Sequence, residues 1–542
     1  MENVEETNVT TTQETNEVQE NSQTQENSSS EVSLLATAEQ FYKVVGPDIK
    51  QFYGRKVLYA DYEESDLNIG SIKDLENKVA DILNLVWSTH TANAYEIDYL
   101  EKYYRGYQPI LGKRKDVRPT INNIIIENNA FFVTNFKVGY VFGEPIQFVQ
   151  RGDVANPEVG SLNSYVLAED KYSKDTELAE SLYNTGIAHR MVLPEVNDDS
   201  PFDIQNLDSK TTFIVYSSSV GHKKLLGVTF TKGVRSNQIK GSIYTRTGYY
   251  TFTKDITSNS FNVKFVQNHF LGMIPIFEYY LNKWRIGIVE VVMSIFNALN
   301  RISSGDVDGL EQYIQSILVF INQEIDKDTY NDVLSLGAVE LYSADATRPA
   351  DLKLIQNELN HANTEVLHKR LFNLALTIIG IPRLEDKASG GDTGQARLLG
   401  EGWTMADERA KQDEMAFKRC SKEEIKLILK ICRLTPNSGI KTLTVKDIDQ
   451  KFTRNKSDNF LVKAQGLKNL ISSGVSPDVA MTSSGIFSDS NEAYNKSIEF
   501  YDGIENWIKT IMKKSAKSST TENTEAKTEE SDQKENSESE EE

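Results

Sequence analysis

Few residue patterns in this 542-residue chain have the types and spacing that chemistry at a protein site requires. The segment GGDTGQ at 390–395 is rich in glycine, but it lacks the Lys-Ser/Thr pair of a phosphate-binding P-loop. His361 and His368 are seven residues apart, hence on one face of a helix, but no glutamate-containing zinc pattern surrounds them. We therefore expect solvated helix histidines and no metal site.

The other acids, bases and nucleophiles are similarly isolated. Glu385 and Asp386 are adjacent, but they lie in a predicted loop where burial would not shift their pKa values. The chain has no G-x-S-x-G elbow. Its two cysteines, Cys420 and Cys432, are too few for a disulfide framework or a zinc site. We predict that the chain is not an enzyme and needs no cofactor.

A basic run is the strongest candidate for a binding surface. It follows three tyrosines at 103–107 and consists of Lys113, Arg114, Lys115 and Arg118. Basic and aromatic side chains together are typical of nucleic-acid surfaces. A solvated turn with tyrosines packed beneath it would give the same pattern, so the sequence leaves both interpretations open.

The formal net charge of -20 is concentrated at the two ends of the chain. Residues 1–32 hold eight Glu and no Lys or Arg, and residues 517–542 hold ten acidic and three basic residues. Both ends are poor in large apolar residues, which predicts disordered acidic tails at 1–32 and 515–542. They could serve as binding arms or only as solubilising tails. No apolar run reaches the roughly 18–20 residues of a membrane span, so we expect no membrane contact.

The chain between the tails is expected to be α+β and mainly helical. Residues 33–105 have apolar positions at helical spacing, and a second helix is expected after Pro119, with a turn at Gly139. Between 210 and 281, β-branched and aromatic runs alternate with Gly, Asn and Ser, which predicts strands. Pro275 predicts that the last of these strands lies at a sheet edge, because proline cannot donate to a ladder.

Residues 285–434 alternate long helical patterns with short insertions. The first helix carries an apolar stripe at steps of three or four, formed by Ile288, Val291, Ile295, Leu299 and Ile302. A short helix is expected around 310–320, followed by short strands. The second helix carries two stripes, formed by Leu352, Ile355, Leu359, Ala362 and Val366 and then by Leu367, Leu371, Leu374 and Ile378.

The second helix is expected to end at Pro382. A glycine-rich loop then leads into one long helix over 396–434, with a kink expected near Gly400 and Gly402. A short strand and small helices are expected over 435–510. Neither of the two flanking helices carries a catalytic group, so this part of the chain builds a rigid wall rather than a pocket.

Five segments, in order, resemble the portal proteins of tailed bacteriophages, of the type found in siphoviruses of Gram-positive hosts. They are YYRGYQPIL (103–111), INN…GYVFGEPI (121–146), MIPIFEYYLNKWRIGIVEVVMSIFNALNRISSGDVDGLEQYIQSILVF (273–320), SGGDTGQARLLGEGWTMADERAKQDEMAFKR (389–419) and FTRNKSDN…LISSGVSPDVAMTSSGIFSDSNEAYNKS (452–497). The resemblance covers roughly residues 40–500. The family often has Gly-Asp where this chain has Gly287-Ile288.

The resemblance implies a portal fold with the parts of a spoke. These are a wing at 33–282, stem helices at 283–304 and 353–382 around a clip at 305–352, a tunnel loop at 383–395, a long wing helix at 396–434, and a helical crown at 435–514. It also implies a closed ring, usually of twelve subunits, at one capsid vertex of the virion. Such a ring assembles in the host cytoplasm and conducts double-stranded DNA without sequence specificity.

The resemblance further implies partners and DNA-facing residues. The clip would dock the terminase large subunit and later a head–tail adaptor, and the wing would contact capsid and scaffolding proteins. The tunnel loop would face DNA with Arg383, Lys387, Ser389, Gly390, Gly391, Thr393 and Gly394. Lys387 could form a basic ring near DNA, or only cap a helix or pair with Asp386. The alternative function is a helical nucleic-acid-processing enzyme, which would need a catalytic constellation that the sequence does not show.

Overall fold

The computed structural model describes a large central part of the chain. The described residues are 50–115, 119–151, 156–195, 199–233, 238–255, 260–314, 317–321, 351–355, 361–383, 402–454, 460–487, 490–501, 503, 505, 506 and 509. Both predicted tails, Gly400 and most of the glycine-rich loop lie outside these residues.

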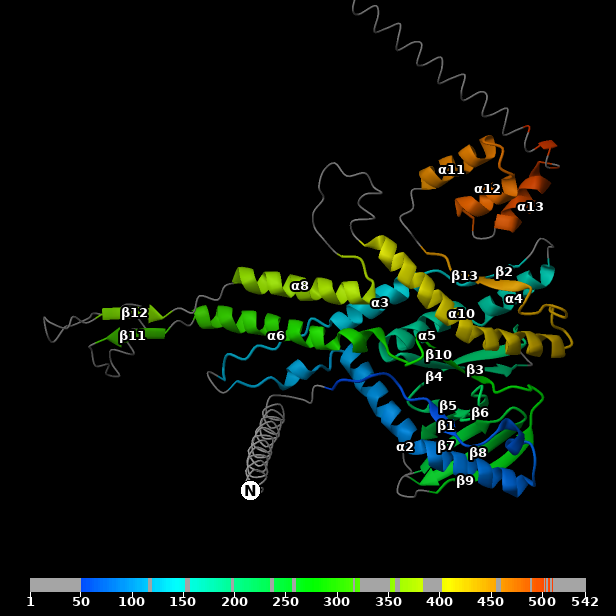
Figure 1. The fold of residues 1–542 in the computed structure, drawn as a ribbon, viewed down its shortest axis with the longest axis horizontal. Helices are drawn as coiled ribbons and strands as arrows, with labels where there is room; N and C mark the ends of the chain where they lie inside the picture. Colours follow the sequence, from blue (N-terminus) through cyan, green and yellow to red (C-terminus); the bar gives the residue numbers. More distant parts are fainter. Residues whose placement is uncertain are drawn as a thin grey trace, which may run out of the picture.

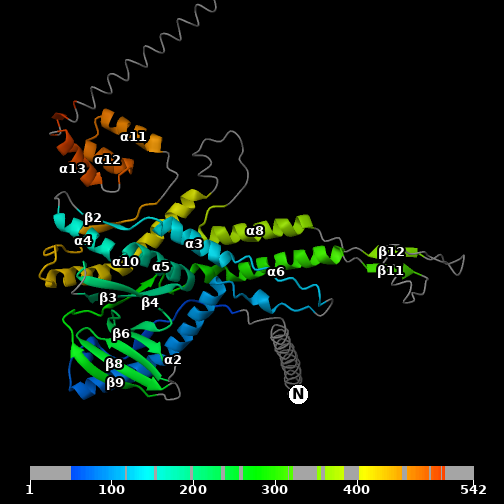
Figure 2. The same ribbon diagram turned by 180° about the vertical axis from the view of Figure 1, so that it is seen from behind.

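The fold joins a β-rich end, a helical middle and a projecting helix pair (Figure 1). The helices are α2 (Ile72–Tyr104), α3 (Asn129–Phe142), α4 (Pro157–Ala168), α5 (Lys171–Thr185), α6 (Ile288–Ile314), α8 (His361–Ile379), α10 (Trp403–Leu434), α11 (Phe460–Ser472), α12 (Pro477–Ser484) and α13 (Ser490–Phe500). Two 3₁₀ helices are η1 (Glu64–Leu67) and η2 (Pro109–Gly112). The pair α6 and α8 extends away from the body, and the small helices α11–α13 gather at another side (Figure 2).

The strands of the described residues form four sheets. A six-stranded sheet has the order β1-β5-β6-β7-β8-β9 and a three-stranded sheet the order β10-β3-β4, while β11 pairs with β12 and β13 with β2. The strands are β1 (Leu58–Ala60), β2 (Gln147–Gln150), β3 (Ile187–Pro194), β4 (Phe202–Leu207), β5 (Thr212–Ser217), β6 (Lys224–Lys232), β7 (Gln238–Tyr244), β8 (Gly248–Asp255), β9 (Asn262–Asn268), β10 (Ile276–Tyr280), β11 (Ile317–Ile321), β12 (Asp351–Ile355) and β13 (Ile448–Lys451).

The prediction of strands between 210 and 281 is confirmed. Pro275 directly precedes β10, which is an edge strand of its sheet, as predicted. The helical prediction for 33–105 is wrong over 50–71, which contains β1 and the short 3₁₀ helix η1 but no α-helix. Strand β1 has three residues and pairs in parallel with β5, so its hydrogen bonds come from a segment about 150 residues away that local periodicity does not reveal.

The helix expected directly after Pro119 begins only at Asn129. The intervening backbone is bound to α6 instead, because the amide of Ile125 donates to Ser304 Oγ and that of Glu127 to Asn300 Oδ1. Gly139 lies within α3 and forms no turn there, so the predicted turn is wrong. Side chains of a distant helix therefore replace the hydrogen bonds that a local helix would have made.

The boundaries in the helical middle also differ from the prediction. The short helix expected at 310–320 is absent, because α6 continues to Ile314 and β11 then pairs antiparallel with β12. Leu352 and Ile355 consequently lie in a strand. Gly402 marks no kink, since it stands at the N-cap of α10 with a φ of 83°. Residues 435–454 contain the expected strand, and the helices of the C-terminal part begin at Phe460.

Four apolar cores lie among the described residues, of which the three largest hold the main parts together. The largest surrounds α10, whose buried Phe417 and Ile428 share this core with residues from α3, α5 and β10. A second core lies between α2 and the six-stranded sheet. The third joins α2 and α3 to the bases of α6 and α8. Cys420 and Cys432 are buried in α10, and burial raises the pKa of Cys432 to about 11, which keeps this thiol protonated.

Candidate functional site: a projecting helix pair and its mount

We take the helix pair α6–α8 as the candidate functional site, because contacts with the body hold its base in one position. Near the body, one face of α6 packs against α8 and against α2 and α3 through a continuous apolar cluster. The buried members on the pair are Val289, Val292, Met293, Phe296, Leu299, Ala375, Leu376 and Ile379. Farther out the pair continues into the β11–β12 ladder, so two long segments leave the body side by side (Figure 1).

Glu290 fixes the base of α6 to the body. Its side chain is buried and accepts hydrogen bonds from Arg55 Nη2 at 2.6 Å, from the amide of Gly54 at 2.8 Å and from the amide of Gly287 at 3.1 Å. Burial raises the pKa of Glu290, while the charge of Arg55 and the two backbone donors oppose that shift. Arg55 also lies 3.1 Å from Glu96 on α2, so residues 50–57 form a strap between the two helices.

The turn between β10 and α6 is packed backbone to backbone. Arg285 has a φ of 57° and binds Glu278 through Nε at 2.7 Å and Nη2 at 3.0 Å. The amide of Arg55 donates to the carbonyl of Arg285 at 3.3 Å, which places the strap directly on this turn. A Cβ on Gly54, whose φ is 88°, would lie 2.0 Å from the carbonyl oxygen of Trp284. We call the strap at 50–57 together with this turn the mount of the helix pair. The mount therefore has no room for a side chain at Gly54.

We expect Gly54→Ala to lower the free energy of unfolding by more than about 2 kcal/mol, because the left-handed backbone alone costs a residue with a Cβ roughly 1–2 kcal/mol. The clash with Trp284 adds to this loss. Gly139→Ala is the matched control, since nothing lies within 4 Å of its added Cβ and the site is helical. That control should stabilise the protein by up to about 1 kcal/mol. Thermal and urea denaturation compare the two, and equal effects would contradict a close-packed mount.

A brace formed by residues 113–115 and 119–128 holds α6 farther along its length. Asp308 accepts from Lys113 Nζ at 2.7 Å and from the amide of Asn123 at 2.7 Å, and it lies 3.1 Å from Lys115 Nζ. Two members of the predicted basic surface thus neutralise a carboxylate of α6. Arg114 is exposed, and Arg118 lies outside the described residues. The nucleic-acid role of this run stays a prediction, with fewer available charges than the sequence suggested.

Glu127 joins the brace to both projecting helices. It accepts from Ser303 on α6, from Asn129 Nδ2 at 2.7 Å, and lies 2.7 Å from His368 Nε2 on α8. Burial acts to raise the pKa of Glu127, but the hydrogen bonds from these three side chains outweigh it and the pKa is lowered. His368 is therefore a partner of the brace and not simply a solvated helix residue. The side chain of His361 lies outside the described atoms.

The brace should weaken in acid, because its contacts lower the pKa of Asp308 from the usual 3.8 to about 2. A carboxyl with a depressed pKa contributes stability that is fully present above about pH 4 and is lost as the pH falls towards 2. At pH 5 or above, Asp308→Ala should speed hydrogen exchange at the Asn123 amide by at least about tenfold, the order of one charged hydrogen bond. The variant and wild type should converge below about pH 2, where Asp308 is mostly protonated in the fold. A pH-independent ratio would contradict the assignment.

Large apolar side chains remain exposed on the outside of the helix pair. On α8 they are Val366 (66%), Leu367 (47%), Leu374 (47%) and Ile378 (40%), and on α6 Val291 is 51% exposed. Of the stripe predicted for α6, Leu299 is buried and Ile288 and Ile295 are half-buried against the core, whereas Val291 is exposed. The buried face instead centres on Val292, Met293 and Phe296. In the second helix, Leu367 and Leu374 are exposed while Leu371 is half-buried.

Only the first residue of the predicted tunnel loop can be placed. Helix α8 ends at Ile379, where Gly380 has a φ of 77° and its amide donates to the carbonyl of Leu376 at 2.9 Å. Glycine rather than Pro382 thus ends the helix. Arg383 is exposed where the described chain leaves the body. Lys387, Ser389, Gly390, Gly391, Thr393 and Gly394 lie outside the described residues.

The described residues contain no group of three or more His, Cys, Asp or Glu side chains that could hold a metal ion. Burial lowers the pKa of His90 to about 3 and that of His189 to about 4, so both imidazoles are neutral in the fold. Within the same parts of the chain, no helix combines the length and apolarity needed to cross a bilayer.

Sequence reasoning missed the residues that mount the helix pair. Glu290 is the one charged residue within an apolar run of the sequence, a pattern that indicates a buried charge paired with another group. Arg55, Glu127 and Asp308 carried no comparable signal, because each sits in a locally polar segment. Their roles depend on partners far along the chain.

Comparison with known proteins gives one family and a remote structural likeness. No curated protein matches the sequence. Among solved structures, a chain described as "Neck of empty GTA particle computed with C6 symmetry" aligns with 11% identity, covering 66% of this chain and 90% of that one, with a TM-score of 0.39. The family described as "Phage portal protein, SPP1 Gp6-like" matches residues 83–496, well over half of the 542 residues. This protein thus belongs to the SPP1 Gp6-like family of phage portal proteins.

Proposed function

We propose that this protein forms the portal ring at one vertex of a phage capsid, and that the ring, of about twelve subunits, conducts double-stranded DNA during packaging and ejection. The observation that carries this proposal, beside the family, is the helix pair that projects from the body while keeping large apolar side chains exposed. Contiguous exposed apolar residues on a soluble chain mark an interaction surface.

The exposed faces of α6 and α8 fit a contact between copies of the chain. A closed ring needs a head-to-tail interface in which two different surfaces of each subunit meet. The face of α8 with Leu367, Leu374 and Ile378 would supply one surface, and the face of α6 with Val291 would supply the other. Part of the apolar surface that one chain leaves open would then be buried by its neighbour.

The parts of the portal are assigned from this arrangement. We assign α6 and α8 to the stem, β11 and β12 to the clip, and α11–α13 to the crown. The remaining body, crossed by α10, would be the wing, and residues 435–454 are included in it because β13 pairs with β2 there. The clip would dock the terminase large subunit and later a head–tail adaptor, whereas the wing would meet capsid and scaffolding proteins. Assembly would take place in the host cytoplasm.

We assign no catalysis to the ring, so the energy for DNA movement would come from a separate terminase ATPase. A channel for sliding DNA should bind phosphate weakly, because each neutralised phosphate adds salt-dependent affinity. Arg383 and Lys387 would supply isolated basic rings, and Gly390, Gly391 and Gly394 would let the tunnel loop move as the duplex passes.

The tunnel loop is tested by packaging. Lys387→Ala and a variant with alanine at 390, 391 and 394 should each lower the yield of DNA-filled capsids severalfold, measured as nuclease-resistant DNA per particle. Glu385→Gln, in the same loop, is the control for a general loss of assembly. Wild-type yield from both test variants would remove the role assigned to this loop.

The ring itself is tested by mass. A chain of 61.2 kDa in a ring of twelve should have a mass of about 730 kDa and form annular particles in negative stain. A monomer or dimer with nuclease or ATPase activity would contradict the proposal and favour a nucleic-acid-processing enzyme.

A further inference from the structure

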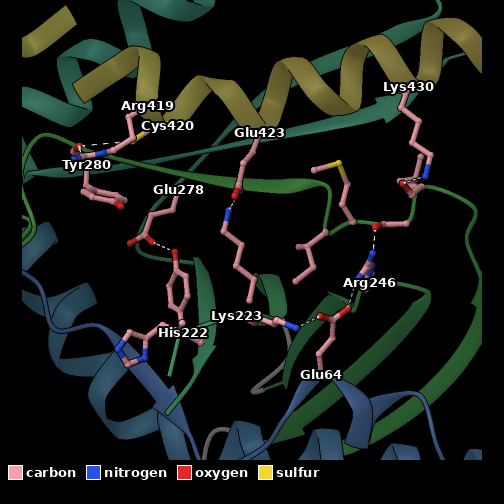
Figure 3. Close-up of a pocket in the computed structure, with 17 residues that line it drawn as sticks. Glu64, His222, Lys223, Arg246, Glu278, Tyr280, Arg419, Cys420, Glu423 and Lys430 are labelled. Atoms are coloured by element: carbon pink, nitrogen blue, oxygen red, sulfur yellow. Dashed lines mark hydrogen bonds and ion pairs between the residues drawn. The ribbon is translucent and has the colours of Figure 1, made fainter. Parts of the chain in front are cut away.

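A second feature, independent of the ring, is a pocket of about 620 Å³ between α10, β10 and the six-stranded sheet (Figure 3). Basic side chains enter it from separate elements, with Arg419 and Lys430 on α10, Lys223 in the turn before β6, and Arg246 in the turn before β8. In Figure 3, Arg419 and Lys430 extend from separate turns of α10 at opposite sides of the pocket, and Lys223 and Arg246 lie near Glu64. Like charges that line one pocket repel each other unless an anion is present.

The carboxylates of the pocket do not balance these cations. Glu423 is paired with Lys224, and Glu278 is held at the back of the pocket by Arg285. Glu64 is shared, because Arg246 Nη1 lies 2.6 Å from it and Lys223 Nζ lies 3.9 Å from it.

Two cations on α10 have no carboxylate partner among the described residues. Arg419 donates to the carbonyl of Tyr280 at 3.1 Å, and Lys430 donates to the carbonyl of Leu271 at 2.7 Å. Hydrogen bonds to neutral carbonyls orient these charges but leave them uncompensated. The pocket therefore keeps an excess of positive charge on a chain whose formal net charge is -20.

Exposed apolar side chains stand beside the same pocket. Phe270 is 90% exposed and precedes the lining residue Leu271, and Val220 is fully exposed and precedes the lining residue Gly221. A small inorganic anion would use only the charges. An extended peptide with several carboxylates and occasional apolar residues would contact both the basic side chains and the apolar rim formed by Phe270 and Val220.

This chain contains a segment with that composition. Residues 1–32 have eight Glu, no Lys or Arg, and valines at positions 4, 9, 18 and 32. The described chain begins at Lys50, and ten residues later Ala60 pairs with Ser217 of β5, next to the pocket residue Tyr216. Ten residues span at most about 36 Å, whereas the seventeen residues at 33–49 can extend over about 56 Å. The segment is therefore long enough to reach the pocket from its own Lys50.

We propose that the acidic segment 1–32 of this chain binds in the pocket, with its carboxylates at Lys223, Arg419 and Lys430 and its valines on the apolar rim. Attachment to the same chain gives the segment a high effective concentration, so weak contacts suffice. Binding would neutralise the excess positive charge on this face of the body. An acidic segment of another protein would have to displace it.

A zero-length carbodiimide cross-link tests this on the full chain, because the reagent joins a lysine amine to a carboxylate in direct contact. Lys223 and Lys430 should cross-link to glutamates within residues 1–32, read by mass spectrometry. Lys411 and Lys496, whose side chains are 59% and 72% exposed elsewhere, give the background level. Arg419→Glu should lower the yield of the Lys223 and Lys430 cross-links at least threefold while leaving the background unchanged.

The C-terminal tail provides the matched control, since residues 517–542 are also acidic. Replacing the eight glutamates of residues 1–32 by glutamine should abolish the cross-links, and replacing the acidic residues of 517–542 should not. Cross-links at background level, or joining the pocket mainly to 517–542, would overturn the proposal. Neither result depends on ring formation, so this test can fail while the portal assignment stands.

Discussion

Leu374→Asp should leave the protein as single folded chains of 61.2 kDa in place of a ring. Leu374 lies on the outer face of α8 and is 47% exposed, so an aspartate there contacts water in the single chain and costs little stability. In the proposed ring the same carboxylate would be buried against a neighbour's apolar side chains. Burying a charge without a partner costs at least several kcal/mol, repeated at every subunit contact. Mass photometry across a concentration series measures the change.

Two further substitutions make the interpretation specific. Leu374→Met preserves volume and apolarity and should retain the ring. Leu376→Asp, at a fully buried position of the same helix, should unfold the helix pair and therefore also change circular dichroism and thermal stability. If Leu374→Asp assembled normally, the outer face of α8 would not be a subunit contact. If it unfolded, its exposure in the single chain would need another explanation.

Glu290→Ala should lower the free energy of unfolding of the helix-pair base by about 3–5 kcal/mol, because it leaves the guanidinium of Arg55 buried with one fewer carboxylate. The change also removes the acceptor for the amides of Gly54 and Gly287. Urea denaturation measures the overall loss, and hydrogen exchange over 288–299 locates it. Assembly of the proposed ring should fall as well, since the helix pair would no longer be held at a fixed angle to the body.

A surface ion pair supplies the control for this prediction. Asp98 and Lys102 form an exposed pair on α2, and Asp98→Ala should change stability by less than about 1 kcal/mol. Replacing Arg55 and Glu290 together by methionine should recover much of the loss, because the desolvated charge disappears with its partner. A cost for Glu290→Ala no larger than that of the Asp98 variant would show that the mount does not depend on this buried pair.

Local patterns in the sequence predicted which segments form helices and strands in the helical middle and the β-rich part. The period of apolar residues indicated α6 and α8, and the β-branched runs indicated β5–β10, because these signals depend on neighbours within a few residues. The resemblance to the portal family added the expected order of wing, stem, clip, tunnel loop and crown along the chain. The predicted start or end of a helix or strand was less accurate where it depended on a distant contact. Helix α3, for example, begins only at Asn129, because the backbone before it is bound by side chains of α6.

The tertiary structure alone decided which surfaces are buried and which residues hold the helix pair. Helix α6 is apolar over a wide arc, and periodicity could not tell that Val292, Met293 and Phe296 face the core while Val291 faces outward. Lys113 resembled a free basic charge until the fold brought it to Asp308, 195 residues later in the chain. The period of apolar residues reflects local geometry, whereas burial and charge pairing are set by long-range contacts. Only the folded chain could therefore reveal the residues that hold the helix pair.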